Sequence, residues 1–105
     1  MDIKYSIIIT TTATPEEADK IAKALLEGKF AACVQASQIK SYFPWKGEIS
    51  MENEYVLTIK SKESDFKEIE KCIKENHSYD IPEIIQIPVT NGSDEYLRWI
   101  SEITN

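Results

Sequence analysis

The sequence predicts an α+β domain with the element order βαββαβ and one more helix at its C-terminal end. Three observations predict this class. Alternating apolar residues mark four strands, and apolar residues at helical spacing mark two helices between them. The 105 residues fit one domain, residues 1–105, with no linker, internal repeat or low-complexity stretch. All the elements must therefore share one core.

The first strand is predicted over residues 3–11, "IKYSIIITT", where alternate positions hold Ile3, Tyr5, Ile7 and Ile9. A helix should follow, because "TPEE" carries the signals of a helix start. Thr14 can cap the free amides, Pro15 suits the first helical position, and Glu17 can complete a reciprocal capping box. Gly28 is expected to end the helix in the left-handed conformation. The apolar stripe of this helix consists of Ala18, Ile21, Ala22, Leu25 and Leu26.

Two long strands are predicted over residues 32–42 and 49–61, joined through "FPWKGE" into an antiparallel hairpin. Both exceed the ~5 to 6 residues of an average strand, so the far end should project beyond the helices. An apolar cluster on such an overhang indicates contact with another chain. The cluster at this end consists of Tyr42, Phe43 and Trp45.

The second half repeats the helix and strand pattern. A helix should open at Ser64 or Asp65 and end near Asn76, with an inward stripe of Phe66, Ile69, Cys72 and Ile73. The segment "PEIIQIPV" then predicts a strand in which Pro88 is typical of an edge or a strand end. One face of this strand holds Ile85, Ile87 and Val89. A last short helix, capped by Ser93 or Asp94, carries Tyr96, Leu97, Trp99 and Ile100.

This order predicts a ferredoxin-like sandwich, in which two helices cover one face of a four-stranded antiparallel sheet. The other face is expected to carry Ile8, Val34, Ala36 and Val56, and one short helix cannot cover it. At about 25 cal/mol per Å² of apolar area, leaving these side chains in water would cost several kcal/mol. That cost is comparable to the whole stability of a small domain. We therefore expect copies of the chain to associate and bury this face.

Charge and composition exclude several function classes. The 18 acidic and 12 basic side chains give a net charge of −6, which disfavours binding to nucleic acid. The sequence holds no apolar run long enough to span a membrane, and its start lacks the features of a signal peptide, so a cytoplasmic protein is expected. Cys33 and Cys72 lie far apart in segments that look buried, which favours reduced core thiols.

Four short motifs follow one another along the chain: "KFAACVQ" at 29–35, "SYFPWKGEI" at 41–49, "HSYDIPEII" at 77–85 and "YLRWI" at 96–100. On these motifs the chain resembles the CutA divalent-cation tolerance family from end to end. The resemblance implies a ferredoxin-like subunit assembled as a homotrimer. It also implies an association with copper and with tolerance of divalent metal ions.

His77 is the candidate metal ligand that the resemblance points to. Some bacterial members of the family add a second histidine and a cysteine that take part in copper binding, and here those places hold Asn76 and Thr10 or Thr11. Neutral imidazole suits copper(II), but a single imidazole makes a weak site. Further ligands would have to come from Glu83, from a neighbouring subunit or, for copper(I), from an exposed Cys33 or Cys72. The alternative is a structural histidine that closes the turn after the second helix.

A second candidate site is a polar pocket between subunits, in which a small ligand would meet Lys60, Tyr79 and Glu83. Trp45 and Trp99 would flank it. The alternative is loop architecture, with Glu83 accepting backbone amides or pairing with Lys60 and the tryptophans serving as interface anchors.

The chain lacks the G-x-S-x-G, H-E-x-x-H and phosphate-binding glycine motifs, and no enzyme activity is predicted. The sequence predicts instead a trimeric divalent-metal-binding protein, with copper as the expected ion, that acts in cation tolerance. The alternative is a non-catalytic trimeric scaffold, or a small-molecule regulatory module that resembles the PII proteins.

Overall fold

The structure is a computed structural model that describes residues 2–105. The elements follow the predicted order, with a short 3₁₀ turn at Glu63–Asp65 before the second helix. They are β1 (Tyr5–Thr12), α1 (Pro15–Glu27), β2 (Ala31–Trp45), β3 (Glu48–Lys62), α2 (Phe66–Glu75), β4 (Ile84–Val89) and α3 (Asp94–Ile103). The ferredoxin-like α+β class predicted from the sequence is therefore confirmed.

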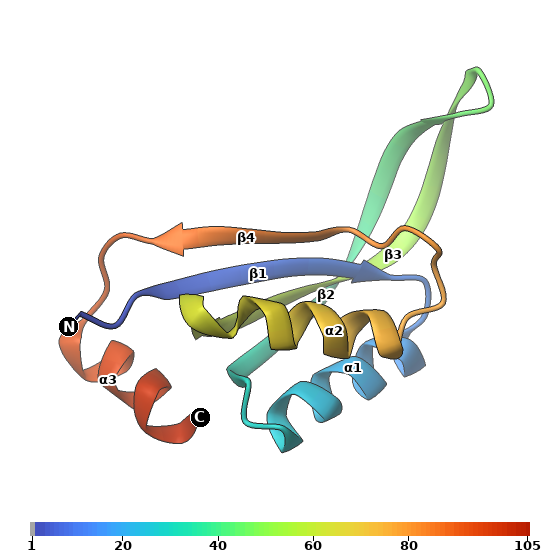
Figure 1. Ribbon diagram of the computed structural model, residues 1–105. Helices are drawn as coiled ribbons and strands as arrows, with labels where there is room; N and C mark the ends of the chain where they lie inside the picture. Colours follow the sequence, from blue (N-terminus) through green and yellow to red (C-terminus); the bar gives the residue numbers. More distant parts are fainter. Residues whose placement is uncertain (1) are drawn as a thin grey trace.

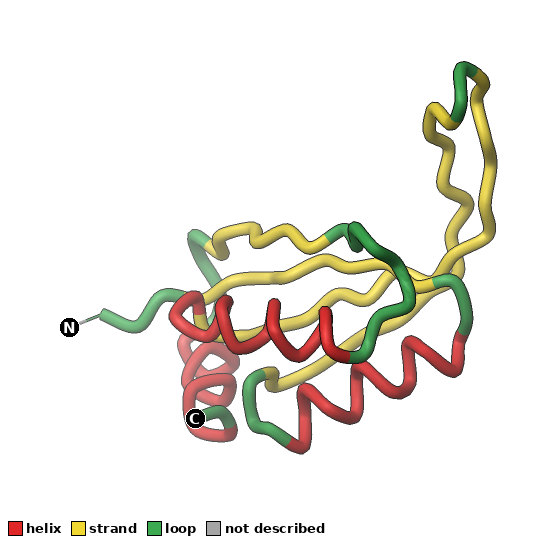
Figure 2. The backbone as a smooth tube through the Cα atoms, turned by 45° about the vertical axis from the view of Figure 1, so that its right-hand side comes forward, coloured by secondary structure: helices red, strands yellow, loops and turns green. Residues whose placement is uncertain are grey.

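The four strands form one antiparallel sheet in the order β2-β3-β1-β4, and α1 and α2 lie side by side on one of its faces (Figure 1, Figure 2). β4 is an edge strand, as its proline indicated. The β2-β3 hairpin projects beyond the helices and gives the molecule its long dimension of 48 Å (Figure 1). Its strands have 15 residues each and meet in a two-residue turn at Lys46 and Gly47, where both φ angles are positive, at 51° and 82°.

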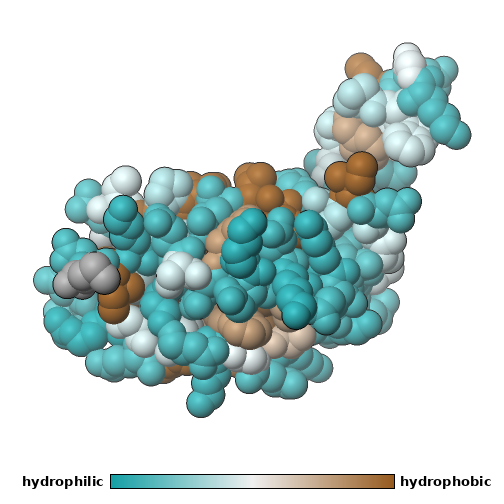
Figure 3. Space-filling model, in the orientation of Figure 1, coloured by the Kyte–Doolittle hydropathy of each residue, from teal (hydrophilic) through white to brown (hydrophobic). Residues whose placement is uncertain are grey.

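The core lies between the two helices and the sheet. Ile8, Leu57 and Ile59 reach it from the strands, and Ile21 and Ile69 reach it from the helices, all with no exposed surface. Seen from the helix side, the outer surface is largely hydrophilic, with hydrophobic atoms in scattered places along the β4 edge, on the projecting hairpin and in the middle of this side (Figure 3). The helix layer therefore encloses one face of the sheet only.

The predicted assignment of the sheet faces was wrong for three of four residues. Ile8 and Val34 both pair with Ile59 in the sheet register, and directly opposed side chains share a face, so all three point toward the helices. Ala36 lies two residues beyond Val34 in β2 and shares that face. Only Val56 lies on the opposite side, as expected. The run of three isoleucines in β1 hid the alternation, because either phase puts apolar residues on both faces.

Buried hydroxyl groups reveal the true phase of β1. Ser6 and Thr10 occupy the helix side, and the Ser6 hydroxyl donates to Gln86 Oε1 over 2.8 Å and lies 3.2 Å from the Ser61 hydroxyl. The other side of the sheet, called the open face below, carries Ile7, Ile9, Val56, Ile85 and Ile87. The face opposite α1 and α2 is therefore apolar, as expected, but of the four predicted residues only Val56 lies on it.

The end of α1 also differs from the prediction. Gly28 has a φ of −78°, and the left-handed residue is Lys29, with a φ of 59°. Glycine is required at position 28 for space, because a Cβ there would lie 2.6 Å from Cε2 of the Phe30 ring. The predicted start of the helix is confirmed, since the Thr14 hydroxyl accepts from the Glu17 amide over 3.2 Å.

α3 packs against β2 and β3, and the chain end fastens it there. Ser93 caps the helix by accepting from the Tyr96 amide, as predicted. The Asn105 amide donates to the Lys29 carbonyl oxygen over 2.9 Å, and its side chain donates to the Gly28 carbonyl oxygen over 2.8 Å. Over residues 2–105, none of the helices has the length and apolar character needed to cross a bilayer.

Candidate functional site

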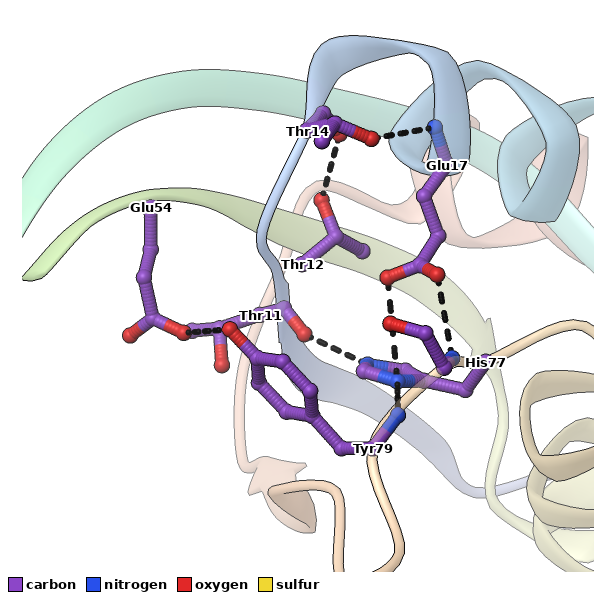
Figure 4. A network of polar contacts seen from close by, with 8 residues as sticks. Thr11, Thr12, Thr14, Glu17, Glu54, His77 and Tyr79 are labelled. Atoms are coloured by element: carbon purple, nitrogen blue, oxygen red, sulfur yellow. Dashed lines mark hydrogen bonds and ion pairs between the residues drawn. The ribbon is translucent and has the colours of Figure 1, made fainter.

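His77 lies just after α2, and its imidazole is fully buried. Nε2 lies 2.7 Å from the carbonyl oxygen of Thr11 in β1, and Nδ1 lies 3.0 Å from the amide nitrogen of Tyr79 (Figure 4). Because the carbonyl can only accept and the amide can only donate, the ring is neutral with its proton on Nε2. Both ring nitrogens therefore serve to hold the loop after α2 against the end of β1.

Glu17 secures the same loop from α1. Its Oε2 accepts from the Ser78 amide over 3.0 Å, and its Oε1 lies 3.7 Å from His77 Nδ1 (Figure 4). The side chain was predicted to reach back to the start of its own helix. It bonds instead to the free amide of a loop 61 residues away, a partner that no local sequence pattern could indicate. The start of α1 and the loop after α2 are thus joined.

These contacts favour the structural interpretation of His77, because a metal ion could bind its imidazole only after one of the two hydrogen bonds broke. Asn76 stands where some members of the family have a second histidine, and its side chain donates to the Cys72 carbonyl oxygen over 2.8 Å. In the described part of the chain, no three side chains from His, Cys, Asp and Glu gather into a metal-binding group. Metal binding at His77 stays a prediction.

The two cysteines are free and half-buried. Burial raises the pKa of the Cys72 thiol, the charge of Glu75 raises it further, and the hydrogen bond from Asn76 lowers it in part. Because the thiolate is the form that binds metals, the raised pKa makes Cys72 a weaker ligand at neutral pH.

A cavity of about 940 Å³ lies between the projecting hairpin and the loop before β4, and it is called the acidic pocket below. It opens on the open face, since Glu54 lies two residues before Val56 in β3 and so shares its face of the strand. Aromatic side chains in its wall come from Phe43, Trp45 and Tyr79. Its carboxylates come from Glu52, Glu54, Asp80 and Glu83. The apolar open face thus ends in a negatively charged hollow.

Tyr79 and Glu54 join the loop to the hairpin inside this pocket. The Tyr79 hydroxyl donates to Glu54 Oε2 over 2.8 Å (Figure 4). Glu54 itself is only 8% exposed. Burial, the hydrogen bond to Glu54 and the charges of Glu54, Glu17 and Glu52 raise the pKa of Tyr79 to about 12. The phenol therefore stays protonated and acts as a donor at neutral pH.

The structure brings together some of the predicted site residues and separates others. Tyr79, Glu83 and Trp45 line the acidic pocket. Lys60 lies elsewhere, with its Nζ 5.5 Å from the centroid of the Tyr96 ring, and the Tyr96 ring in turn lies 5.5 Å from that of Trp99. Lys60 and Glu54 share a face of β3 but are six residues apart, about 20 Å along a strand. The predicted pocket that Lys60 would share between subunits stays a prediction.

Glu52, Glu54 and Asp80 were missed as site residues. A signal was present in "MENEYV", where two glutamates precede Val56 at alternate positions and so share its face of the strand. Glutamates in a strand are usually solvated, so this pattern alone does not indicate a binding site.

Known proteins resemble this chain over nearly its whole length. The family described as "CutA1 divalent ion tolerance protein" matches residues 6–103. The divalent-cation tolerance protein CutA of Archaeoglobus fulgidus is 42% identical over 98 residues, which cover 93% of this chain and 96% of the relative.

Solved structures agree with this match. A structure of the Archaeoglobus fulgidus protein, described there as periplasmic, superposes with a TM-score of 0.92 at 41% identity and covers 94% of this chain and 97% of its own. CutA1 from Oryza sativa superposes with a TM-score of 0.95 at 31% identity, over 98% of this chain and 95% of that one.

Proposed function

Because the chain belongs to the CutA1 divalent-ion-tolerance family, we propose that it is a homotrimer that binds divalent metal ions, copper among them, and so acts in cation tolerance. Its relatives are named for tolerance and not for an enzyme activity, which supports a binding role without catalysis. One observation carries the proposal: an apolar sheet face that α3 covers only in part, and that leaves Ile85 and Ile87 nearly half exposed, runs into a pocket lined with carboxylates.

The open face supports self-association. Ile85 and Ile87 are 48% and 45% exposed on it, next to the free edge of β4. The projecting hairpin adds Trp45 and Ile49, which are 59% and 83% exposed. Large exposed apolar side chains of this kind mark an interface in small domains, although the alternation of β3 puts Ile49 on the helix side of the hairpin. A free strand edge can also pair with another chain. The number of three copies follows from the family resemblance, and three copies around one axis form a closed ring.

The acidic pocket supports cation binding. Its carboxylate oxygens are hard ligands that suit divalent ions, and copper(II) accepts oxygen as well as nitrogen. His77 offers an imidazole, but both of its nitrogens already hold the loop in place. No three of these carboxylates lie close enough to form a complete metal site within the described residues of one chain. We therefore propose that the ion binds at Glu54 with further ligands from a neighbouring subunit, and that His77 keeps Tyr79 in position beside it.

Calorimetric titration of copper(II) and manganese(II) tests the metal part of this proposal. We expect the Glu54→Gln variant to bind about tenfold more weakly, since it loses the charge of a residue that is only 8% exposed. The matched control is Glu70→Gln, which removes a glutamate on α2 outside the pocket. If His77→Gln loses copper binding and Glu54→Gln does not, the ion binds at the imidazole. If wild type binds neither ion, the proposed metal binding is wrong.

Light scattering tests the assembly independently. A mass near three times that of one chain is expected for wild type at micromolar concentration. A mass equal to one chain in well-folded protein would overturn the trimer.

Two further parts of the proposal have their own support. Free Cys33 and Cys72 suit a reducing compartment such as the cytoplasm, which fractionation of the source cells can test. The aromatic walls of the acidic pocket favour the alternative function, a non-catalytic trimeric scaffold or small-molecule module resembling the PII proteins, because a metal ion makes no use of such walls.

A further inference from the structure

Glu54 is a buried carboxylate without a cationic partner. It is 8% exposed and accepts one hydrogen bond, from the Tyr79 hydroxyl to Oε2. A carboxylate offers about four lone-pair positions, so most of its capacity remains free. Within residues 2–105 its carboxylate forms no ion pair. Burying a carboxylate without a positive partner is costly, so its surroundings favour the arrival of a cation.

The other charges around Glu54 have the same sign. Glu52, Asp80 and Glu83 line the same cavity, and the part of the chain that the structure describes places no lysine, arginine or histidine in its wall. Burial raises the pKa of Tyr79 most, and the hydrogen bond to Glu54 and the charges of Glu54, Glu17 and Glu52 raise it further. A cation in the cavity would relieve both the isolation of Glu54 and the mutual repulsion of the carboxylates.

The aromatic side chains in the cavity wall indicate which kind of cation the cavity suits. Trp45 and Phe43 stand on the hairpin side of the cavity and Tyr79 on the loop side. Ring faces attract ammonium and guanidinium groups and also pack against methylene chains. Trp45 already has one such neighbour, the Nζ of Lys46 at 5.7 Å from its ring centroid, on a side chain outside the cavity wall. The volume of about 940 Å³ is typical of sites for small organic molecules and far exceeds the needs of one metal ion.

We propose that the acidic pocket binds an organic cation, an alkylammonium or guanidinium group, with its charge on Glu54 and its carbon chain against Trp45. This inference goes beyond metal binding and does not rest on it. The cation has two sources with the same chemistry: a free small amine, or a lysine or arginine side chain from a second copy of the chain, since the pocket adjoins the open face.

Fluorescence of Trp45 reports directly on the pocket. The chain has two tryptophans, so Trp99→Phe leaves Trp45 as the sole tryptophan, which is excited selectively over the five tyrosines at the red edge of its absorption. This variant is titrated with 1,4-diaminobutane in the presence of EDTA, which removes metal ions, and with uncharged 1,4-butanediol as the matched ligand. We expect a saturable change with the diamine and none with the diol.

Charge-removing substitutions in the same background identify the partner. Glu54→Gln keeps an acceptor for the Tyr79 hydroxyl while losing the charge, and it should weaken diamine binding about tenfold. Glu83→Gln alters only an exposed side chain at the pocket wall and should weaken binding less, which keeps the test valid if Glu54→Gln folds poorly. Glu70→Gln on α2 should bind as the parent does.

Sedimentation without added amine measures self-association, and it distinguishes a free amine from a side chain of a second copy. If the diamine does not bind but Glu54→Gln weakens self-association relative to Glu70→Gln, the cation is a side chain from a second copy. Equal responses to diamine and diol, or no diamine binding together with unchanged self-association of Glu54→Gln, would overturn the proposal. Because EDTA is present throughout, these results stand apart from the success or failure of metal binding.

Discussion

The two faces of the sheet are built from similar residues but are used differently. On the helix side, Ile8 and Leu57 have no exposed surface and pack beneath α1 and α2. On the open face, Ile85 and Ile87 remain nearly half exposed and lead to the acidic pocket. The difference between the faces lies in their cover and not in the strands themselves. One face forms the core of the chain, while the other leaves apolar surface and carboxylates exposed.

Two matched isoleucine substitutions give the largest expected difference. Ile8→Ala empties a site under the helices and should lower the free energy of unfolding by about 3 to 4 kcal/mol. Ile87→Ala removes methyl groups that one chain leaves 45% exposed and should cost about 1 kcal/mol or less within the chain. Urea unfolding at several protein concentrations measures both.

The concentration dependence separates the two faces further. The loss in Ile8→Ala should be similar at every protein concentration, whereas the loss in Ile87→Ala should grow when association contributes to stability. Equal losses in the two variants at low concentration would show that the open face is as well packed as the core.

Local signals explain what the sequence could predict of this fold. Thr14 and Ser93 cap their helices as predicted, because a capping residue and its amide partner lie within three positions. The phase of β1 could not be predicted, since Ile7, Ile8 and Ile9 are alike and only the helices above Ile8 distinguish them. Local spacing therefore determines the elements, and the packing between distant elements determines which face is buried.

The candidate site follows the same rule. Tyr79 and Glu83 lie four positions apart in one motif, and the structure places both in the acidic pocket. Glu54 acquires its role from Tyr79, 25 residues away, and His77 from Thr11, 66 residues away. Such pairings depend on the fold, so a single sequence could point to the loop but could not identify its partners.

His77 connects the two sides of the molecule, because it holds the loop that leaves the helix layer and enters the acidic pocket. His77→Ala should cost about 2 kcal/mol, since the Thr11 carbonyl and the Tyr79 amide lose their buried partner. His77→Gln should cost less, because its amide group can still donate to Thr11. Chemical denaturation measures the cost, and hydrogen exchange at the Tyr79 amide should speed up in both variants. An unchanged exchange rate in His77→Ala would mean that the loop is held without this ring.

Tyr79 gives the smallest effect, and it appears only in alkali. The ordinary pKa of a tyrosine is about 10, and in the folded chain that of Tyr79 is raised to about 12. Below pH 10 both states keep the proton, so the stabilising contribution is complete. Between about pH 10 and about pH 12 the unfolded state releases its proton first, and the free energy of unfolding therefore falls. Because Tyr79 is 36% exposed, solvent screening keeps the loss small.

The comparison of wild type with Tyr79→Phe isolates this contribution, because the other four of the five tyrosines titrate in both proteins. Urea midpoints at about pH 9.5 and about pH 11.5 should fall further in wild type than in the variant, as the linkage between protonation and folding requires. Parallel losses in the two proteins would mean that the Tyr79 phenol does not keep its proton beside Glu54. The negative potential that makes the acidic pocket attractive to cations would then be weaker than the contacts on the open face imply.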